Sequence, residues 1–135
     1  MKTDFSKLID PLSPVLSVYL FGSAAAGIQG ANSDVDIAVY LNETISSDTA
    51  IELRFQLMDL FEEYFDRPVD VVLLNSASLK MVHQVLKKGE LLYARDPAKL
   101  RAFALRKRKA YFDFKYYIDK DIEQMRSFYG VEPRG

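Results

Sequence analysis

The 135-residue sequence contains no cysteine and only one histidine, and it has no long apolar run. Without cysteine, the chain forms neither a disulfide framework nor a thiolate metal site, and nothing in it requires an oxidising compartment. No apolar stretch approaches the length of a membrane span. Residues 1–10 carry acidic side chains and lack the apolar core of a signal peptide. We therefore expect a cytoplasmic protein that does not associate with membranes.

Excess charge of one sign is also absent. The formal net charge of -1 provides no overall attraction to nucleic acid or to an anionic membrane, so non-specific nucleic-acid binding is not expected. Apolar residues make up 49% of the chain and charged residues 27%, which is ordinary globular usage and predicts a folded chain. The length is typical of a single domain with one core of moderate size.

Hydrophobic periodicity predicts strands and helices that alternate along the chain. Apolar runs typical of strands occupy residues 15–21, 34–41 and 69–74, and a fourth, edge strand is predicted at residues 90–94. A short helix is expected at residues 3–9. A capping box of Thr49 and Glu52 predicts the start of a longer helix that runs to about Phe65.

The second half of the chain is predicted to be mainly helical. One helix is expected from a cap at Ser76 or Ser78 to a stop at Gly89. Between Pro97 and about Phe128 there is no glycine or further proline, which favours one long helix or two packed helices. The whole pattern predicts an α/β (α+β) fold, in which a small mixed sheet is covered by helices mainly on one face and followed by a long C-terminal helical segment.

Asp34 and Asp36 are the first residues that indicate chemistry. Side chains at positions i and i+2 of a strand share a face, so both carboxylates point the same way. Val35, Ile37 and Val39 then point to the opposite, buried side. Carboxylates at this spacing suit Mg²⁺, because this hard cation needs few protein ligands and accepts water and phosphate oxygens for the remainder.

Three more residues complete the candidate site. Gly22 and Ser23 follow the first predicted strand, where a glycine lets backbone N–H groups approach a phosphate and the serine hydroxyl adds a donor. A helical turn expected after Ser23 would direct its positive N-terminal end toward the β- and γ-phosphates. Asp70 interrupts the third apolar run and faces away from the side that its neighbouring valines bury, so an adjacent strand would bring it beside the aspartate pair.

At these residues the sequence resembles the nucleotidyltransferase superfamily that includes DNA polymerase beta, and within it the minimal nucleotidyltransferase (MNT) group. The shared pattern is Gly22-Ser23, ten further residues, Asp34-Val35-Asp36, and an acid in Val69-Asp70-Val71-Val72. The resemblance implies that Gly22 and Ser23 bind the triphosphate. It also implies that Asp34, Asp36 and Asp70 are catalytic residues that bind Mg²⁺ in a two-metal site, with ATP as the substrate. Asp70 would in addition assist the attacking hydroxyl.

The resemblance extends over residues 15–96, since residues 88–93 look like the end of an MNT domain. We therefore expect residues 1–96 to form the minimal nucleotidyltransferase domain and residues 97–135 to form a C-terminal helical extension of the same domain. One departure from the family pattern is Ala26, where many members carry arginine.

Proteins of this size in the group resemble the antitoxin half of HEPN/MNT toxin–antitoxin pairs. The resemblance implies that the chain transfers AMP from ATP to a tyrosine hydroxyl of a HEPN ribonuclease toxin, its expected partner, and so neutralises it. Two alternatives remain open. One is a small-molecule nucleotidyltransferase of the aminoglycoside type that acts as a homodimer, and the other is a non-catalytic antitoxin that acts by occlusion.

Residues outside the motif allow two interpretations each. His83 shares an apolar helical face with Leu79 and Val82, which favours a structural role. A cationic run follows Pro97 and is typical of a solvated helix face, yet it also suits contacts with nucleotide phosphates or a partner: Arg101, Arg106, Lys107, Arg108 and Lys109. The aromatic side chains after this run exceed one core-facing stripe, which favours core packing for some and a partner surface for others: Tyr111, Phe112, Phe114, Tyr116 and Tyr117.

Overall fold

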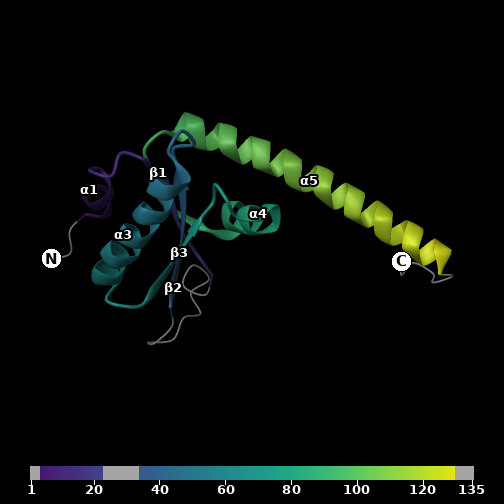
Figure 1. Cartoon of the computed structure of the whole chain (residues 1–135), viewed down its shortest axis with the longest axis horizontal. Helices are drawn as coiled ribbons and strands as arrows, with labels where there is room; N and C mark the ends of the chain where they lie inside the picture. The colour runs from purple at the N-terminus through teal and green to yellow at the C-terminus, as the bar shows by residue number, and fades with distance from the viewer. Residues whose placement is uncertain (1–3, 23–33, 130–135) are drawn as a thin grey trace.

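A computed structural model describes residues 4–22 and 34–129 of the chain (Figure 1). Its centre is a four-stranded mixed sheet in the order β3-β2-β1-β4. The strands are β1 (Val15–Phe21), β2 (Val35–Leu41), β3 (Val69–Leu73) and β4 (Glu90–Ala94). β1 pairs antiparallel with both β2 and β4, whereas β2 and β3 are parallel. The helices are α1 (Phe5–Ile9), α3 (Ser47–Phe65), α4 (Leu79–Lys88) and α5 (Pro97–Phe128).

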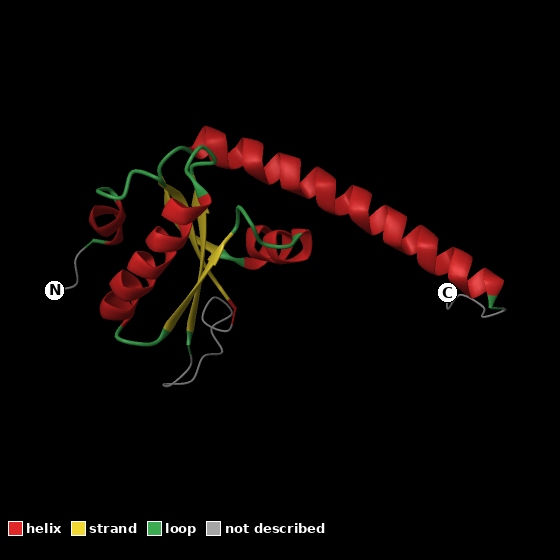
Figure 2. Ribbon diagram, in the orientation of Figure 1, coloured by secondary structure: helices red, strands yellow, loops and turns green. Residues whose placement is uncertain are grey.

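Helices cover both faces of the sheet, as Figure 2 shows. α1 and α3 pack on one face, and α4 and the start of α5 pack on the other. The predicted mixed α/β fold is confirmed, but the expectation that helices lie mainly on one face is wrong. The reason is that β2 buries both of its alternating sets of side chains. Val35, Ile37 and Val39 face α1 and α3, and Ala38 and Tyr40 face α4 and α5.

The helix ends follow local capping chemistry. Ser46 caps α3, because its hydroxyl accepts a hydrogen bond from the Thr49 N–H at 3.2 Å. The predicted cap at Thr49 is therefore wrong by about one turn. Thr49 instead supplies the backbone N–H that the Ser46 side chain caps. Ser78, one of the two predicted caps of α4, accepts a hydrogen bond from the Met81 N–H at 3.1 Å, and the helix ends before Gly89 as predicted.

α5 is a single helix, and its two halves have different surroundings. Near its start, Leu100 and Phe103 are buried, and the Phe103 ring stacks on Tyr40 with ring centroids 4.1 Å apart. Farther along, α5 projects away from the sheet (Figure 1) and exposes large apolar side chains. These are Phe112, Phe114, Tyr116, Tyr117, Ile118, Ile122, Met125, Phe128 and Tyr129. No helix in the described parts of the chain is long and apolar enough to cross a membrane.

The two halves of α5 should respond differently to loss of a phenylalanine. We expect Phe103→Ala to lower the free energy of unfolding by about 3–5 kcal/mol, because Phe103 is 1% exposed and its loss opens a cavity beside Tyr40. Phe128→Ala should change it by no more than about 0.5 kcal/mol, because that side chain is 82% exposed. Urea unfolding of both variants measures the difference, and equal losses would contradict the fold described for α5.

Candidate active site

The parallel pairing of β2 with β3 brings two of the predicted acids together. In this register Val35 pairs with Val69 and Asp36 pairs with Asp70. Residues paired across neighbouring strands project from the same face of a sheet. The Asp36 and Asp70 carboxylates therefore share the face opposite the one on which the two valines are buried. β2 is therefore the adjacent strand that was expected to bring Asp70 beside the aspartate pair.

Asp34 and Gly22 lie at the same end of these strands. Asp34 directly precedes β2 and is exposed, and Gly22 directly follows β1, whose last residue, Phe21, pairs with Asp36. Gly22 has φ +73°, a left-handed conformation that favours glycine, and a Cβ there would lie only 2.3 Å from Asp36 Oδ2. Gly22 thus lies against the Asp36 carboxylate, and the phosphate contact expected of it stays a prediction. Ser23, the second predicted triphosphate ligand, lies outside the described residues.

Burial and neighbouring negative charges both act on the Asp36 carboxylate. The pKa of Asp36 is raised above its ordinary value, first by burial and then by the negative charges of Asp70 and Asp34. The two other acids are thus near enough to act on Asp36 electrostatically. The structure therefore brings Asp34, Asp36, Asp70 and Gly22 together.

Arg54 contacts this group, although no motif in the sequence indicates it. Its Nη2 lies 3.6 Å from Asp70 Oδ1, and its Nε donates a hydrogen bond to the Val71 carbonyl oxygen at 2.6 Å. Both partners of the ion pair are well exposed, so solvent screens it and it contributes little to stability. An arginine next to the buried Leu53 is typical of any amphipathic helix, so its spacing carries no signal.

The donor set fits Mg²⁺ in kind. Across residues 4–22 and 34–129, no three histidine or acidic side chains form a ready-made metal cluster. Mg²⁺ does not require one, because it binds through one or two carboxylates and completes its shell with water and substrate phosphates. Asp34, Asp36 and Asp70 supply hard oxygen donors, and a divalent cation would offset the burial and the neighbouring negative charges that together raise the Asp36 pKa.

His83 makes a packing contact. Its ring stacks on the Tyr111 ring of α5, with ring centroids 3.9 Å apart and an angle of 7° between the planes. This contact agrees with the structural role that the sequence favours for His83. The local pattern around Leu79 and Val82 did not indicate that its partner, Tyr111, lies on α5.

Comparison with known proteins matches the segment that carries these residues. The family model described as "Polymerase beta, Nucleotidyltransferase" matches residues 5–98. Protein adenylyltransferase MntA of Shewanella oneidensis is 36% identical over 86 residues, which span 64% of this chain and 59% of that protein. Spectinomycin 9-adenylyltransferase of Staphylococcus aureus is 33% identical over 85 residues, or 60% of this chain and 32% of that protein. The chain thus matches less than two thirds of the length of either relative.

Solved structures with a similar fold come from toxin–antitoxin complexes. A crystal structure of "the toxin-antitoxin with AMP-PNP" contains a chain that is 30% identical, with a TM-score of 0.69, and the match covers 88% of this chain and 93% of that one. A second describes "tri-AMPylated Shewanella oneidensis HEPN toxin in complex with MNT antitoxin", with 27% identity, a TM-score of 0.63, and coverage of 88% and 90%. Both matches support the nucleotidyltransferase fold.

Asp36→Asn should stabilise the folded chain at neutral pH in the presence of a metal chelator. Folding raises the Asp36 pKa, so ionisation opposes folding, and the wild type loses stability as the pH rises from the ordinary aspartate pKa through the raised value. Asparagine removes this penalty. The gain should shrink below about pH 3.9, where aspartate is neutral in both states.

Thermal unfolding of both proteins across this pH range measures the effect. The matched control is Asp59→Asn, because Asp59 is exposed on α3. The explanation of the Asp36 pKa would be wrong if Asp36→Asn lowered the melting temperature at neutral pH.

Proposed function

The chain belongs to the polymerase beta-like nucleotidyltransferase family, and from this premise we propose that it transfers AMP from ATP to a tyrosine hydroxyl of a HEPN toxin. The observation that carries the proposal is the pairing of Asp36 with Asp70 beside Gly22. The acceptor is proposed from the relatives, which include a protein adenylyltransferase and an MNT antitoxin in complex with an AMPylated HEPN toxin.

In the proposed site, Gly22 and Ser23 bind the triphosphate, and Asp34, Asp36 and Asp70 hold Mg²⁺. When bound, Mg²⁺ supplies Lewis-acid polarisation of the phosphoryl oxygens and offsets charge on the leaving group. Gly22 contributes by its lack of a side chain, because a Cβ there would force the Asp36 carboxylate to move from its present position. The nucleotide and the carboxylates can therefore approach each other at this end of β1 and β2.

Asp70 is the group proposed to act on the acceptor. A tyrosine hydroxyl has a pKa of about 10 and is a weak nucleophile while protonated. The Asp70 carboxylate accepts the phenolic proton as the oxygen forms a bond to the α-phosphorus of ATP, and the bond from that phosphorus to the bridging oxygen breaks. Pyrophosphate leaves on the side of Gly22. Arg54 is a positioning residue, since it contacts Asp70 from α3.

The projecting half of α5 supports a protein acceptor. Its apolar side chains, from Phe112 to Tyr129, bury little surface within the described domain. Exposed apolar side chains in such number on one helix are typical of protein–protein contacts. We propose that the toxin docks partly on this half of α5 and presents its tyrosine to Asp70.

A second candidate is a small-molecule nucleotidyltransferase, which the similarity to spectinomycin 9-adenylyltransferase favours. The match covers only 32% of that protein, so a second copy of the chain would have to enclose the drug. A third is an antitoxin that binds its partner without chemistry. These three candidates differ in which molecule receives the nucleotide.

Transfer of label from ATP tests the proposal. We expect the wild-type chain, incubated with Mg²⁺, α-labelled ATP and a HEPN protein from the same organism, to label a tyrosine of that protein, as mapped by peptide mass spectrometry. Asp34→Asn and Asp36→Asn should each lower the rate at least about a hundredfold, because they remove metal-binding charge. Asp59→Asn makes the same chemical change at an exposed site on α3 and should retain full activity.

Two results would replace the proposal with an alternative. Labelling of an aminocyclitol or aminoglycoside by the chain alone, with no label on the toxin, would establish the small-molecule enzyme. A toxin that binds tightly but never acquires label would leave occlusion as the mechanism.

Gly22→Ala tests the close approach at Asp36. The added Cβ would lie 2.3 Å from Asp36 Oδ2, so the carboxylate must rotate away, and φ +73° is strained for alanine. We expect a stability loss of about 1–2 kcal/mol from the strained backbone and a fall in transfer of about a hundredfold from the displaced carboxylate. Unfolding and single-turnover rates separate the two effects. Wild-type turnover in a folded Gly22→Ala protein would contradict the proposed site.

A further inference from the structure

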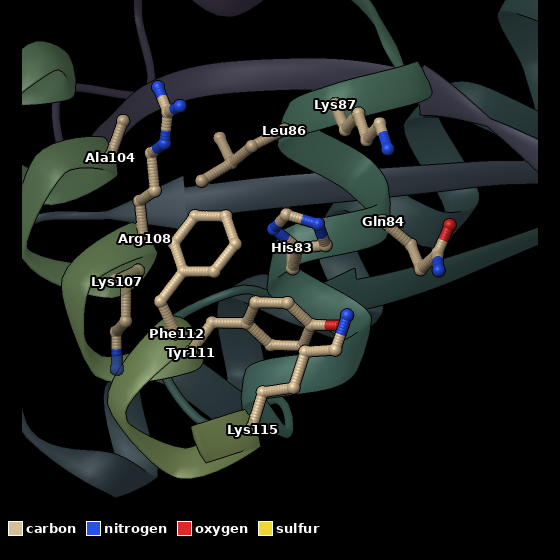
Figure 3. Close-up of a pocket in the computed structure, with 10 residues that line it drawn as sticks. All are labelled: His83, Gln84, Leu86, Lys87, Ala104, Lys107, Arg108, Tyr111, Phe112 and Lys115. Atoms are coloured by element: carbon tan, nitrogen blue, oxygen red, sulfur yellow. The ribbon is translucent and has the colours of Figure 1, made fainter. Parts of the chain in front are cut away.

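A cavity of about 560 Å³ lies between α4 and α5 (Figure 3). α4 contributes His83 and Lys87 to its wall, and α5 contributes residues from Ala104 to Lys115. None of the three aspartates of the candidate active site lines it. Its volume is typical of pockets that bind small molecules.

The lining of this cavity is strongly cationic. Lys87, Lys107, Arg108 and Lys115 belong to the lining, which includes no acidic side chain. Within the described part of the chain, none of the four forms an ion pair, since the two salt bridges found there involve Arg54 and Arg106. The whole chain has a formal charge of -1, so this concentration of positive charge is local and attracts an anion to this cavity.

Aromatic rings form the rest of the wall. His83 and Tyr111 lie parallel with ring centroids 3.9 Å apart, and the Phe112 ring meets His83 edge-on at 5.9 Å. The Arg108 guanidinium lies 5.7 Å from the centre of the Phe112 ring. Figure 3 shows these rings between the lysine and arginine side chains of the lining. Planar surfaces of this kind stack on the flat ring of a ligand.

We propose that this cavity is a second nucleotide site, in which a base stacks on the outer face of the parallel His83–Tyr111 pair while Lys107, Arg108 and Lys115 bind its phosphate. Stacking rings beside unneutralised cations match the two parts of a nucleotide, a planar base and an anionic phosphate. A metal cation would be repelled by this positively charged lining. The enclosed volume favours a mononucleotide over an extended strand.

His83 provides a direct reporter, because it is the only histidine in the chain. Its ring C–H signals in a ¹H–¹³C NMR spectrum are therefore assigned without ambiguity. AMP is titrated into the full chain in the presence of EDTA, so that binding at the carboxylates through Mg²⁺ does not contribute. We expect a saturable shift of the His83 signals in the wild type and the same shift in Asp36→Asn. This readout is independent of the proposed transfer reaction.

Two charge variants decide whether the cavity is the site. The double variant Lys107→Gln/Lys115→Gln removes two lining cations and should weaken AMP binding at least about tenfold. Lys109→Gln removes one cation at an exposed position of α5 outside the lining and should bind AMP as the wild type does. Equal melting temperatures would show that both variants are folded.

Three results would overturn the proposal. The first is the absence of a saturable His83 shift up to millimolar AMP, and the second is wild-type affinity in the double variant. The third is a His83 shift with a short oligoadenylate but not with AMP, which would assign the cavity to a strand of nucleic acid in place of a free nucleotide.

Discussion

The parallel register between β2 and β3 determines where the carboxylates of the candidate site lie. Because side chains alternate along a strand, a slip of one residue would turn every side chain of β3 to the other face. Asp70 would then enter the core, and Val69 and Val71, both nearly inaccessible to solvent, would leave it. The burial of these valines against α3 therefore holds Asp70 beside Asp36. Packing on the buried face of β3 therefore determines which carboxylate stands on its opposite face.

This arrangement places a local energetic conflict on the chemical face. Burial and two neighbouring negative charges oppose ionisation of Asp36, so the folded chain is less stable with the carboxylate charged. The apolar layer under the site, which includes Leu57 and Phe61 of α3, offsets this cost. The same repulsion favours a cation at the proposed metal site, because a positive charge would offset the negative charges of the carboxylates next to Asp36. The surroundings of Asp36 thus lower the stability of the folded chain without metal and also give the proposed site its affinity for metal.

The sequence predicts features that depend on near neighbours and misses those that join distant elements. The strands, the Ser78 cap and the Gly89 stop follow from local patterns, as does the spacing of Asp34 and Asp36. Two serine or threonine residues three positions apart both fit a cap, and the Glu52 side chain favoured the wrong one. Arg54 contacts Asp70 only because α3 packs beside β3, and His83 meets Tyr111 only because α5 crosses α4. Neither contact has a signature along the chain.

α5 carries residues of both the proposed toxin-docking surface and the proposed second nucleotide site, because it is packed at its start and exposed toward its end. Phe103 anchors its start in the core, whereas Phe128 near its end is exposed. The His83–Tyr111 stack lies between these regions, where α5 leaves its contact with α4. A nucleotide bound at this stack would contact the base of the segment on which the toxin is proposed to dock. Such a ligand would affect toxin binding only as far as it changes the position of α5, since coupling between sites requires different affinities for different states.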